Sequence, residues 1–200
     1  MDDSLSSISH VFASGFVDGD YARTLNLHEI QMREYWPEYS KIYLFENPAV
    51  FSYLVLETIQ FLKKNDTSYK HFTNAFPPLV CTSGQARSAT KYFVRKCLEV
   101  NPDCTVYYSG DFDLHGIQML HKMEEIAQKK IVQHFMDATT YRRFLDPDSI
   151  PMSSQDRKIL SKMRGDELAQ AMVEAGAKVY QESTVAELKE DWIRLVAGVV

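Results

Sequence analysis

The chain has 200 residues and a mass of 23.0 kDa, which suits one compact domain with at most a short attachment. Its composition, 45% hydrophobic and 24% charged, excludes disordered, collagen-like and coiled-coil proteins. A net charge of −5 argues against a non-specific DNA-coating protein, which needs surplus cations to neutralise phosphates. No apolar run reaches the roughly 18–20 residues of a membrane span, and three cysteines without a Cys-x-x-Cys pair fit a reducing compartment. We therefore expect a cytoplasmic protein without a membrane partner.

The first forty residues have the weakest periodicity, and we expect 1–40 to be an N-terminal arm or the remnant of an upstream region. Within them, residues 23–27 alternate like a short edge strand. Residues 28–35 suit one or two helical turns that end before Pro37. The remainder, 41–200, is predicted to form the main domain.

From residue 41 onward, short apolar strands alternate with helices. The predicted strands cover 41–45, 79–82 and 104–109, and the predicted helices cover 49–64, 85–100 and 114–134. This alternation is typical of βαβ units. The last third predicts a helix over 166–175, a strand over 178–181 and a helix over 184–196. The predicted fold class is α/β, with a mostly parallel sheet of about four strands covered by helices on both faces.

Carboxylates follow two of these strands. Glu46 comes directly after the first, and Asp111 and Asp113 come after the third. Because the carboxyl ends of parallel strands share one edge and neighbouring strands lie about 4.8 Å apart, the three acids can converge. A hard divalent cation, Mg²⁺ or Mn²⁺, would relieve their repulsion, so the sequence predicts such a metal site. The alternative is a polar turn in which Asp113 caps the following helix.

Three segments carry a resemblance to a known family: Phe45–Val50, Cys81–Gln85 and Gly110–Gly116. A Glu after the first strand and Asp-x-Asp after a later one resemble the Toprim arrangement of topoisomerases, primases and several nucleases. The chain resembles more closely the Toprim-like C-terminal domain of a bacterial family. That family supplies the nuclease subunit of Wadjet-type plasmid-defence systems, beside an SMC-like ATPase and its partners. The similarity covers roughly residues 20–190, and it includes Met136–Ala138 and Val179–Glu182.

By this resemblance, Glu46, Asp111 and Asp113 would be the catalytic and metal-binding acids, and Glu46 would also act as general base or acid. Glu182 is a further candidate metal ligand, with a surface acid before the last helix as the alternative. The implied activity is Mg²⁺- or Mn²⁺-dependent hydrolysis of DNA within an assembly that contains SMC-like ATPase subunits. The oligomeric state is left undecided, with a homodimer as one alternative. Two other readings stay open as well: topoisomerase-like or primase-like nucleotidyl transfer, and a catalytically silent interaction module.

A basic stripe accompanies the second of the predicted long helices. Arg87, Lys91 and Arg95 recur every four residues and would share one helix face. Ser83 and Gly84 precede them, with Ser83 as the expected cap of a helix N-terminus that can receive a phosphate. We expect these five residues to contact the DNA backbone. The alternative is a solvated outer face.

Overall fold

The computed structural model describes residues 7–13, 22–65, 77–83 and 86–198. The strands are β1 (Ile8–Phe12), β2 (Arg23–Asn26), β3 (Lys41–Phe45), β4 (Leu79–Cys81), β5 (Thr105–Ser109), β6 (Val132–Gln133), β7 (Ile150–Pro151) and β8 (Ala177–Lys178). The helices are α1 (Leu27–Gln31), α2 (Pro48–Lys64), α3 (Ser88–Val100), α4 (Leu114–Ala127), α5 (Ala138–Phe144), α6 (Ser154–Leu160), α7 (Glu167–Ala175) and α8 (Val185–Ala197). A 3₁₀ turn, η2 (Gln181–Thr184), precedes α8.

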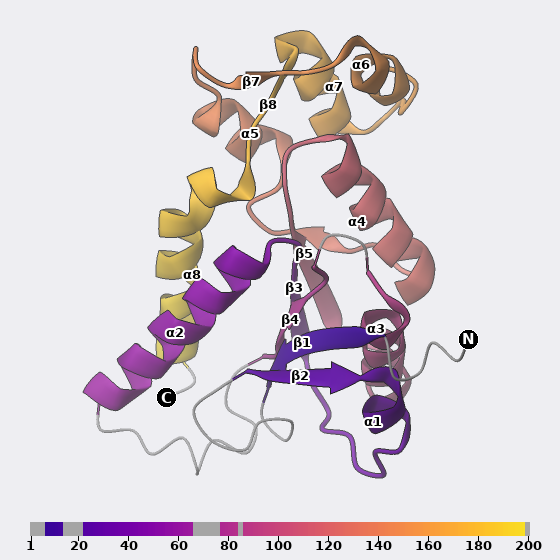
Figure 1. Ribbon diagram of the computed structural model, residues 1–200, viewed down its shortest axis with the longest axis vertical. Helices are drawn as coiled ribbons and strands as arrows, with labels where there is room; N and C mark the ends of the chain where they lie inside the picture. Colours follow the sequence, from indigo (N-terminus) through magenta and orange to yellow (C-terminus); the bar gives the residue numbers. More distant parts are fainter. Residues whose placement is uncertain (1–6, 14–21, 66–76, 84–85, 199–200) are drawn as a thin grey trace.

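Among the described residues, six strands form one sheet in the order β2-β1-β4-β3-β5-β6 (Figure 1). The strands β4, β3, β5 and β6 pair in parallel, whereas β1 and β2 add an antiparallel edge. The prediction of an α/β fold with a mostly parallel sheet is therefore confirmed, although the sheet has six strands rather than about four, because β1 and β2 extend it. Strands β1 and β2 lie within the first forty residues and belong to this same sheet.

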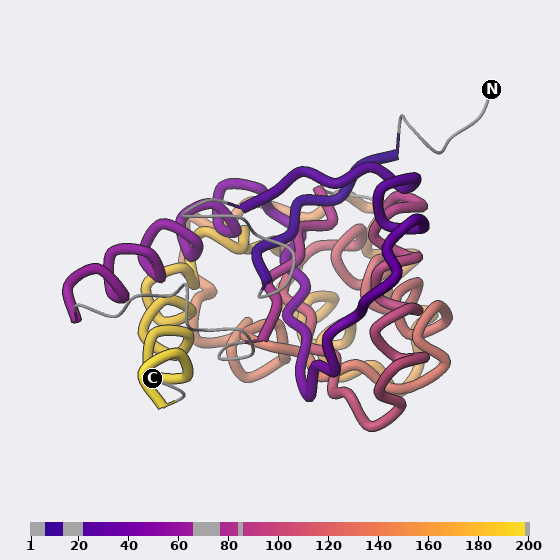
Figure 2. The backbone as a smooth tube through the Cα atoms, turned by 90° about the horizontal axis from the view of Figure 1, so that it is seen from below, coloured from indigo at the N-terminus to yellow at the C-terminus, as the bar shows by residue number. Residues whose placement is uncertain are grey.

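The sheet is covered on both faces because its strands are apolar on both faces. On β3, Ile42 and Leu44 point into one apolar cluster, and Tyr43 and Phe45 point into the other. Helices α2 and α8 cover the second face, while α1, α3 and α4 cover the first, as the view along the strands shows (Figure 2). No helix in the described ranges is both long and apolar enough to cross a membrane.

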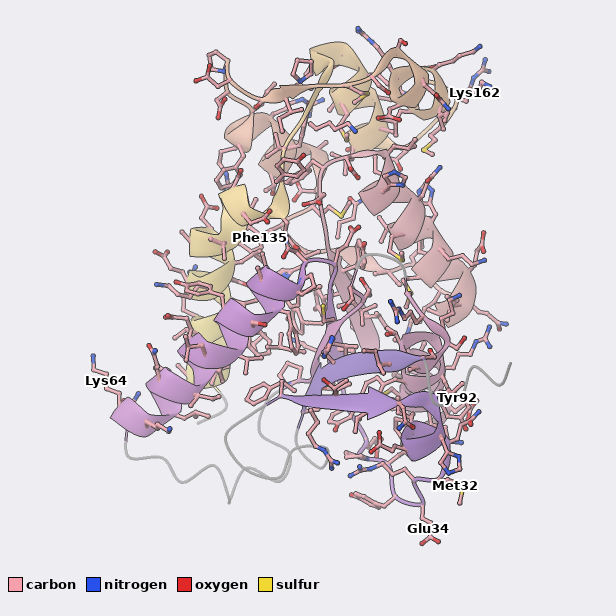
Figure 3. The ribbon with its side chains drawn as sticks, in the orientation of Figure 1. Met32, Glu34, Lys64, Tyr92, Phe135 and Lys162 are labelled. Carbon is pink, nitrogen blue, oxygen red and sulfur yellow. The ribbon has the colours of Figure 1, made fainter. Side chains whose placement is uncertain are left out.

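The segment from α5 to β8, residues 138–178, forms a cap beyond the carboxyl ends of the parallel strands (Figure 1). Strands β7 and β8 pair within it in antiparallel fashion. Lys162 lies at the outer end of this cap, whereas Lys64 lies at the far end of α2 (Figure 3). Helix α2 thus starts on the side of the cap and runs away from it (Figure 1).

Three local predictions were wrong. The helix expected over 114–134 ends at Ala127, because Gln128 adopts a left-handed conformation with φ of 53° and the chain then enters β6. The strand expected over 178–181 ends at Lys178, and η2 follows. Ser83 caps no helix: it has φ of 52°, and Arg87 occupies the N-cap position of α3.

Candidate metal centre

The three predicted acids lie together at the carboxyl edge of the sheet. In the parallel register of β3 and β5, Phe45 pairs with Ser109, and the Glu46 N–H donates to the Ser109 carbonyl oxygen at 3.0 Å. Glu46, Asp111 and Asp113 line one cleft of about 620 Å³. The other lining residues come from the α3 and α4 region: Ala86, Lys91, His115, Gln118, Met119 and Lys122. The convergence predicted from the strand ends is present in the structure.

Glu46 is a partly buried carboxylate at the base of the acidic cluster. The buried Tyr108 hydroxyl donates to its Oε2 at 2.9 Å. Burial raises the pKa of Glu46 to about 7, with the charges of Asp111 and Asp113 adding to the rise and the Tyr108 hydrogen bond opposing it. A Cβ atom on Gly110 would lie 2.5 Å from Glu46 Oε2, so any larger residue there would displace the Glu46 carboxylate from its present position.

The two aspartates are held by backbone donors. Asp111 Oδ1 accepts from the Gln181 N–H at 2.8 Å. Burial raises the pKa of Asp111, this hydrogen bond opposes the rise, and the charge of Asp113 adds to it. Asp113 is the N-cap of α4 and accepts from the Gly116 N–H at 2.8 Å. The capping role that the sequence offered as an alternative is therefore real, and Asp113 faces the acidic cleft as well.

Glu182 lies beside the cluster rather than in the cleft. Its Oε1 accepts from Asn47 Nδ2 at 2.6 Å, and its charge contributes to the raised pKa of Asp111. Because η2 replaces the expected strand, Glu182 is an exposed residue of a 3₁₀ turn. It can join the acids as an outer ligand but does not line the cleft they share.

The acidic cluster fits a hydrated divalent cation better than a closed metal cage. Within the described residues, no three His, Cys, Asp or Glu side chains surround a single point as a ready ligand set. Internal donors already engage an oxygen of each of Glu46, Asp111 and Asp113. Mg²⁺ binds through one or two carboxylates, keeps several waters and shares substrate phosphates, so it does not require such a cage. The oxygen-only, like-charged donor set meets the chemical requirements of Mg²⁺ and Mn²⁺.

Only part of the predicted basic stripe reaches this cleft. Lys91 lines it, and Lys122 of α4, which the sequence analysis did not single out, lines it too. The exposed Arg87 forms the N-cap of α3, and Arg95 lines a separate hollow with Lys129. Ser83 is exposed and is not a cleft residue, while Gly84 lies outside the described residues.

Gln181 was not predicted as a site residue. It is fully buried, and its backbone and side chain contact residues at the ends of β3 and β5. These partners are 70 or more positions away in sequence, so no local sequence pattern predicts that Gln181 contacts them. In the sequence, Gln181 was included only in a predicted strand over 178–181 and in a segment that resembles the Toprim-like family.

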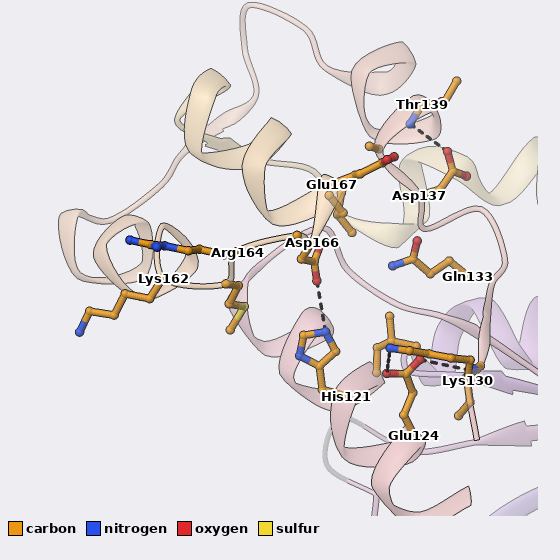
Figure 4. A pocket seen from close by; sticks show the side chains of 16 residues that line it. His121, Glu124, Lys130, Gln133, Asp137, Thr139, Lys162, Arg164, Asp166 and Glu167 are labelled. Carbon is orange, nitrogen blue, oxygen red and sulfur yellow. Dashed lines mark hydrogen bonds and ion pairs between the residues drawn. The ribbon is translucent and has the colours of Figure 1, made fainter. Parts of the chain in front are cut away.

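A second, larger hollow of about 800 Å³ lies between α4 and the start of α7 (Figure 4). Three of its acids make structural contacts. Asp166 caps α7 and lies 3.2 Å from His121 Nε2, and Glu124 lies 3.0 Å from Lys130 Nζ. Asp137 caps α5. Both cationic and anionic side chains line this hollow, whereas Glu46, Asp111 and Asp113 line the smaller cleft together.

Comparison with known proteins places the chain in a family without assigning an activity to it. No curated protein matches the sequence. Residues 23–192 match the model of the family described as "Protein of unknown function C-terminus (DUF2399)", a span that includes all the acids of the cleft. The chain therefore belongs to the DUF2399 C-terminal family.

Proposed function

We propose that the chain is a metal-dependent DNA endonuclease that hydrolyses phosphodiester bonds. One observation carries the proposal: acids from the ends of two adjacent parallel strands face a single cleft whose wall includes two lysines. Function in open α/β sheets gathers at this edge. Carboxylates beside cations suit a phosphodiester, because the acids can hold a metal ion while Lys91 and Lys122 attract the phosphate backbone.

The residues divide into three roles. Glu46, Asp111 and Asp113 would hold Mg²⁺ or Mn²⁺, with Glu182 as an outer ligand. The bound ion would supply Lewis-acid polarisation of the scissile phosphate and activation of a water. Glu46 would accept or return a proton during the reaction, because burial raises its pKa to about 7 and so brings it near neutral pH.

The resemblance to the Toprim-like domain of Wadjet nuclease subunits supports the wider biological role. On that basis the chain acts as the nuclease component of an SMC-linked anti-plasmid complex. The charge of the chain is consistent with a subunit that depends on its partners to bind DNA. The net charge of −5, with Lys91 and Lys122 as the cleft lysines among the described residues, predicts weak DNA binding by the chain alone, so partner subunits would load the DNA.

Thermal unfolding with and without Mn²⁺ tests the metal site without requiring the partner subunits. A ligand at a hundredfold excess over Kd stabilises the folded state by about 2.7 kcal/mol. For a chain of this size, each kcal/mol raises Tm by about 2–4 °C. We expect the wild type to show this rise and Asp113→Asn to lose most of it. Asn is as good an N-cap as Asp, so α4 should stay folded in this variant.

Asp137→Asn is the matched control, because Asp137 also caps a helix through backbone N–H groups but lies outside the acidic cleft. It should keep the full Mn²⁺ response. Plasmid nicking in Mn²⁺ then tests the reaction. No stabilisation of the wild type at millimolar Mn²⁺, or an equal response in Asp113→Asn, would contradict the proposed site. A covalent protein–DNA adduct in place of free nicked product would instead favour the topoisomerase-like reading.

A further inference from the structure

Gln181 occupies the point where the two acid-bearing strand ends meet the C-terminal part of the chain. Its side chain is fully buried, and each polar atom of its amide has a partner. The Asn47 N–H donates to Gln181 Oε1 at 3.2 Å, and Gln181 Nε2 donates to Ser109 Oγ at 2.8 Å. One amide thus bridges the residue after Glu46 to the last residue of β5.

The backbone of Gln181 also forms a direct hydrogen bond with one of the acids, Asp111. The Gln181 N–H donates to Asp111 Oδ1 at 2.8 Å. Just before it, Val179 and Phe112 exchange both backbone hydrogen bonds, at 2.9 and 3.3 Å, as an isolated antiparallel bridge. The Gln181 carbonyl oxygen in turn accepts from Thr184 Oγ1 at 2.8 Å, which closes η2. The segment 179–181 therefore runs along the loop that carries Asp111 and fastens it.

These contacts set the spacing of the acids. The three carboxylates repel one another, and the strand pairing that ends with the Glu46–Ser109 backbone bond fixes β3 and β5 but not the residues beyond them. The Gln181 amide ties the end of β3 to the end of β5, and its N–H draws the Asp111 carboxylate toward the same point. A buried amide whose oxygen and nitrogen are both hydrogen-bonded is held in place, because losing either bond leaves an unpaired polar atom in the interior.

We propose that Gln181 is a positioning residue of the acidic centre, which holds Glu46 and Asp111 at the separation that a divalent cation needs. The inference rests on the proposed metal site and adds to it a residue that touches neither metal nor substrate. In metal proteins, residues that orient the ligands change metal affinity by about 10–100-fold when they are replaced.

The test compares Gln181→Met with Thr58→Val by titrating Mn²⁺ and measuring the free ion by electron paramagnetic resonance. Met keeps the length and volume of Gln but makes neither amide hydrogen bond. Thr58 is likewise fully buried, and it accepts a hydrogen bond of 2.7 Å from Trp192 Nε1 on the face of the sheet that α2 and α8 cover. Both variants should lower Tm. Only Gln181→Met should weaken Mn²⁺ binding, by about 10–100-fold.

Activity gives a second readout that separates positioning from folding. Nicking by Gln181→Met, measured at a temperature where circular dichroism shows the metal-free variant to be fully folded, should recover when Mn²⁺ is raised in proportion to the loss of affinity. Under that condition metal-induced refolding cannot account for the recovery. Ser109→Ala, which removes one partner of the amide, is the milder variant to use if Gln181→Met does not fold, and a weakening of a few-fold is expected.

The outcomes distinguish the two proposals. If the wild type binds Mn²⁺ and both Gln181→Met and Ser109→Ala bind it equally tightly, the positioning role of Gln181 is overturned and the metal site stands. If the wild type itself binds no Mn²⁺, the proposed function is overturned, and the proposed role of Gln181 is overturned with it. Equal losses of affinity in Gln181→Met and Thr58→Val would also overturn the inference, because they would mark a general loss of stability.

Discussion

At Gly116, the first turn of α4 passes directly against the loop that carries the acids. A Cβ at this position would overlap the Asp111 carbonyl oxygen and lie 2.9 Å from Met136 Cε. The carbonyl belongs to the backbone and cannot rotate away, so Gly116→Ala should shift the loop or the helix. We expect a loss of about 1–3 kcal/mol in the free energy of unfolding, measured by urea denaturation.

Gly198→Ala supplies the comparison, because a Cβ there would make only ordinary contacts, the nearest at 3.5 Å from the Arg194 carbonyl oxygen. Its unfolding midpoint should match that of the wild type. An unchanged midpoint for Gly116→Ala would mean that the loop carrying Asp111 is looser than its contacts indicate.

His134 should make stability depend on pH in the acid range. Burial lowers its pKa to about 4, and the Asp191 carboxylate, 3.1 Å from Nε2, only partly opposes that shift. In the unfolded chain the pKa is about 6.5, so between pH 6.5 and 4 the unfolded state binds more protons. Stability is therefore lost as pH falls through this window, on the order of 2 kcal/mol by pH 4.5.

His134→Asn should lose less stability than the wild type between pH 7 and 4.5, whatever its absolute stability. The measurement is the urea midpoint at several pH values. His28→Gln, a change at an exposed position of α1, should leave the slope with pH as it is in the wild type. Parallel pH curves for wild type and His134→Asn would show that His134 becomes protonated without a penalty in the folded state.

The end of α4 shows how one residue can stop an element. Gln128 follows the last helical residue with φ of 53°, a region that favours glycine, and its side chain is exposed. Gln128→Gly should therefore stabilise the protein by about 0.5–1 kcal/mol in thermal or urea unfolding. Lys158→Gly, at an exposed position within α6, should destabilise it by a similar amount, because glycine is a poor helix former. Stabilisation by both changes or by neither would contradict this account.

The elements that the sequence predicted well are those with strong local patterns. The apolar run at 41–45 became β3 at the same residues, and the helix before Asn65 was placed within one residue of its observed start. The extension of α4 to residue 134 failed because an αL stop at a glutamine has no composition signal. Strand β1 was missed because its pairing with β4 joins residues about 70 positions apart.

The same distinction explains what was predictable about the site. Glu46, Asp111 and Asp113 were found because strand ends of a parallel sheet share an edge, which is a rule of topology rather than of contacts. Gln181 and Lys122 reach the site through packing between segments that are distant in sequence, which local sequence patterns do not predict. Lys91 and Arg95 were predicted to act together from helical spacing, but the packing of α3 on α4 places them at different hollows.

At the scale of the whole molecule, the distribution of charge limits how the chain can hold DNA. The net charge is −5, and two lysines, Lys91 and Lys122, line the acidic cleft. Each phosphate contact contributes about −0.9 to the slope of log K against log salt, so duplex binding in EDTA should show a slope of about −2. Lys91→Ala should reduce the magnitude by about 1. Lys41→Ala, at the amino end of β3 and thus at the opposite edge of the sheet, should leave it unchanged. Fluorescence anisotropy across a salt series measures these slopes. A wild-type slope steeper than about −5, or one unaffected by Lys91→Ala, would place the DNA on a different surface from the acidic cleft.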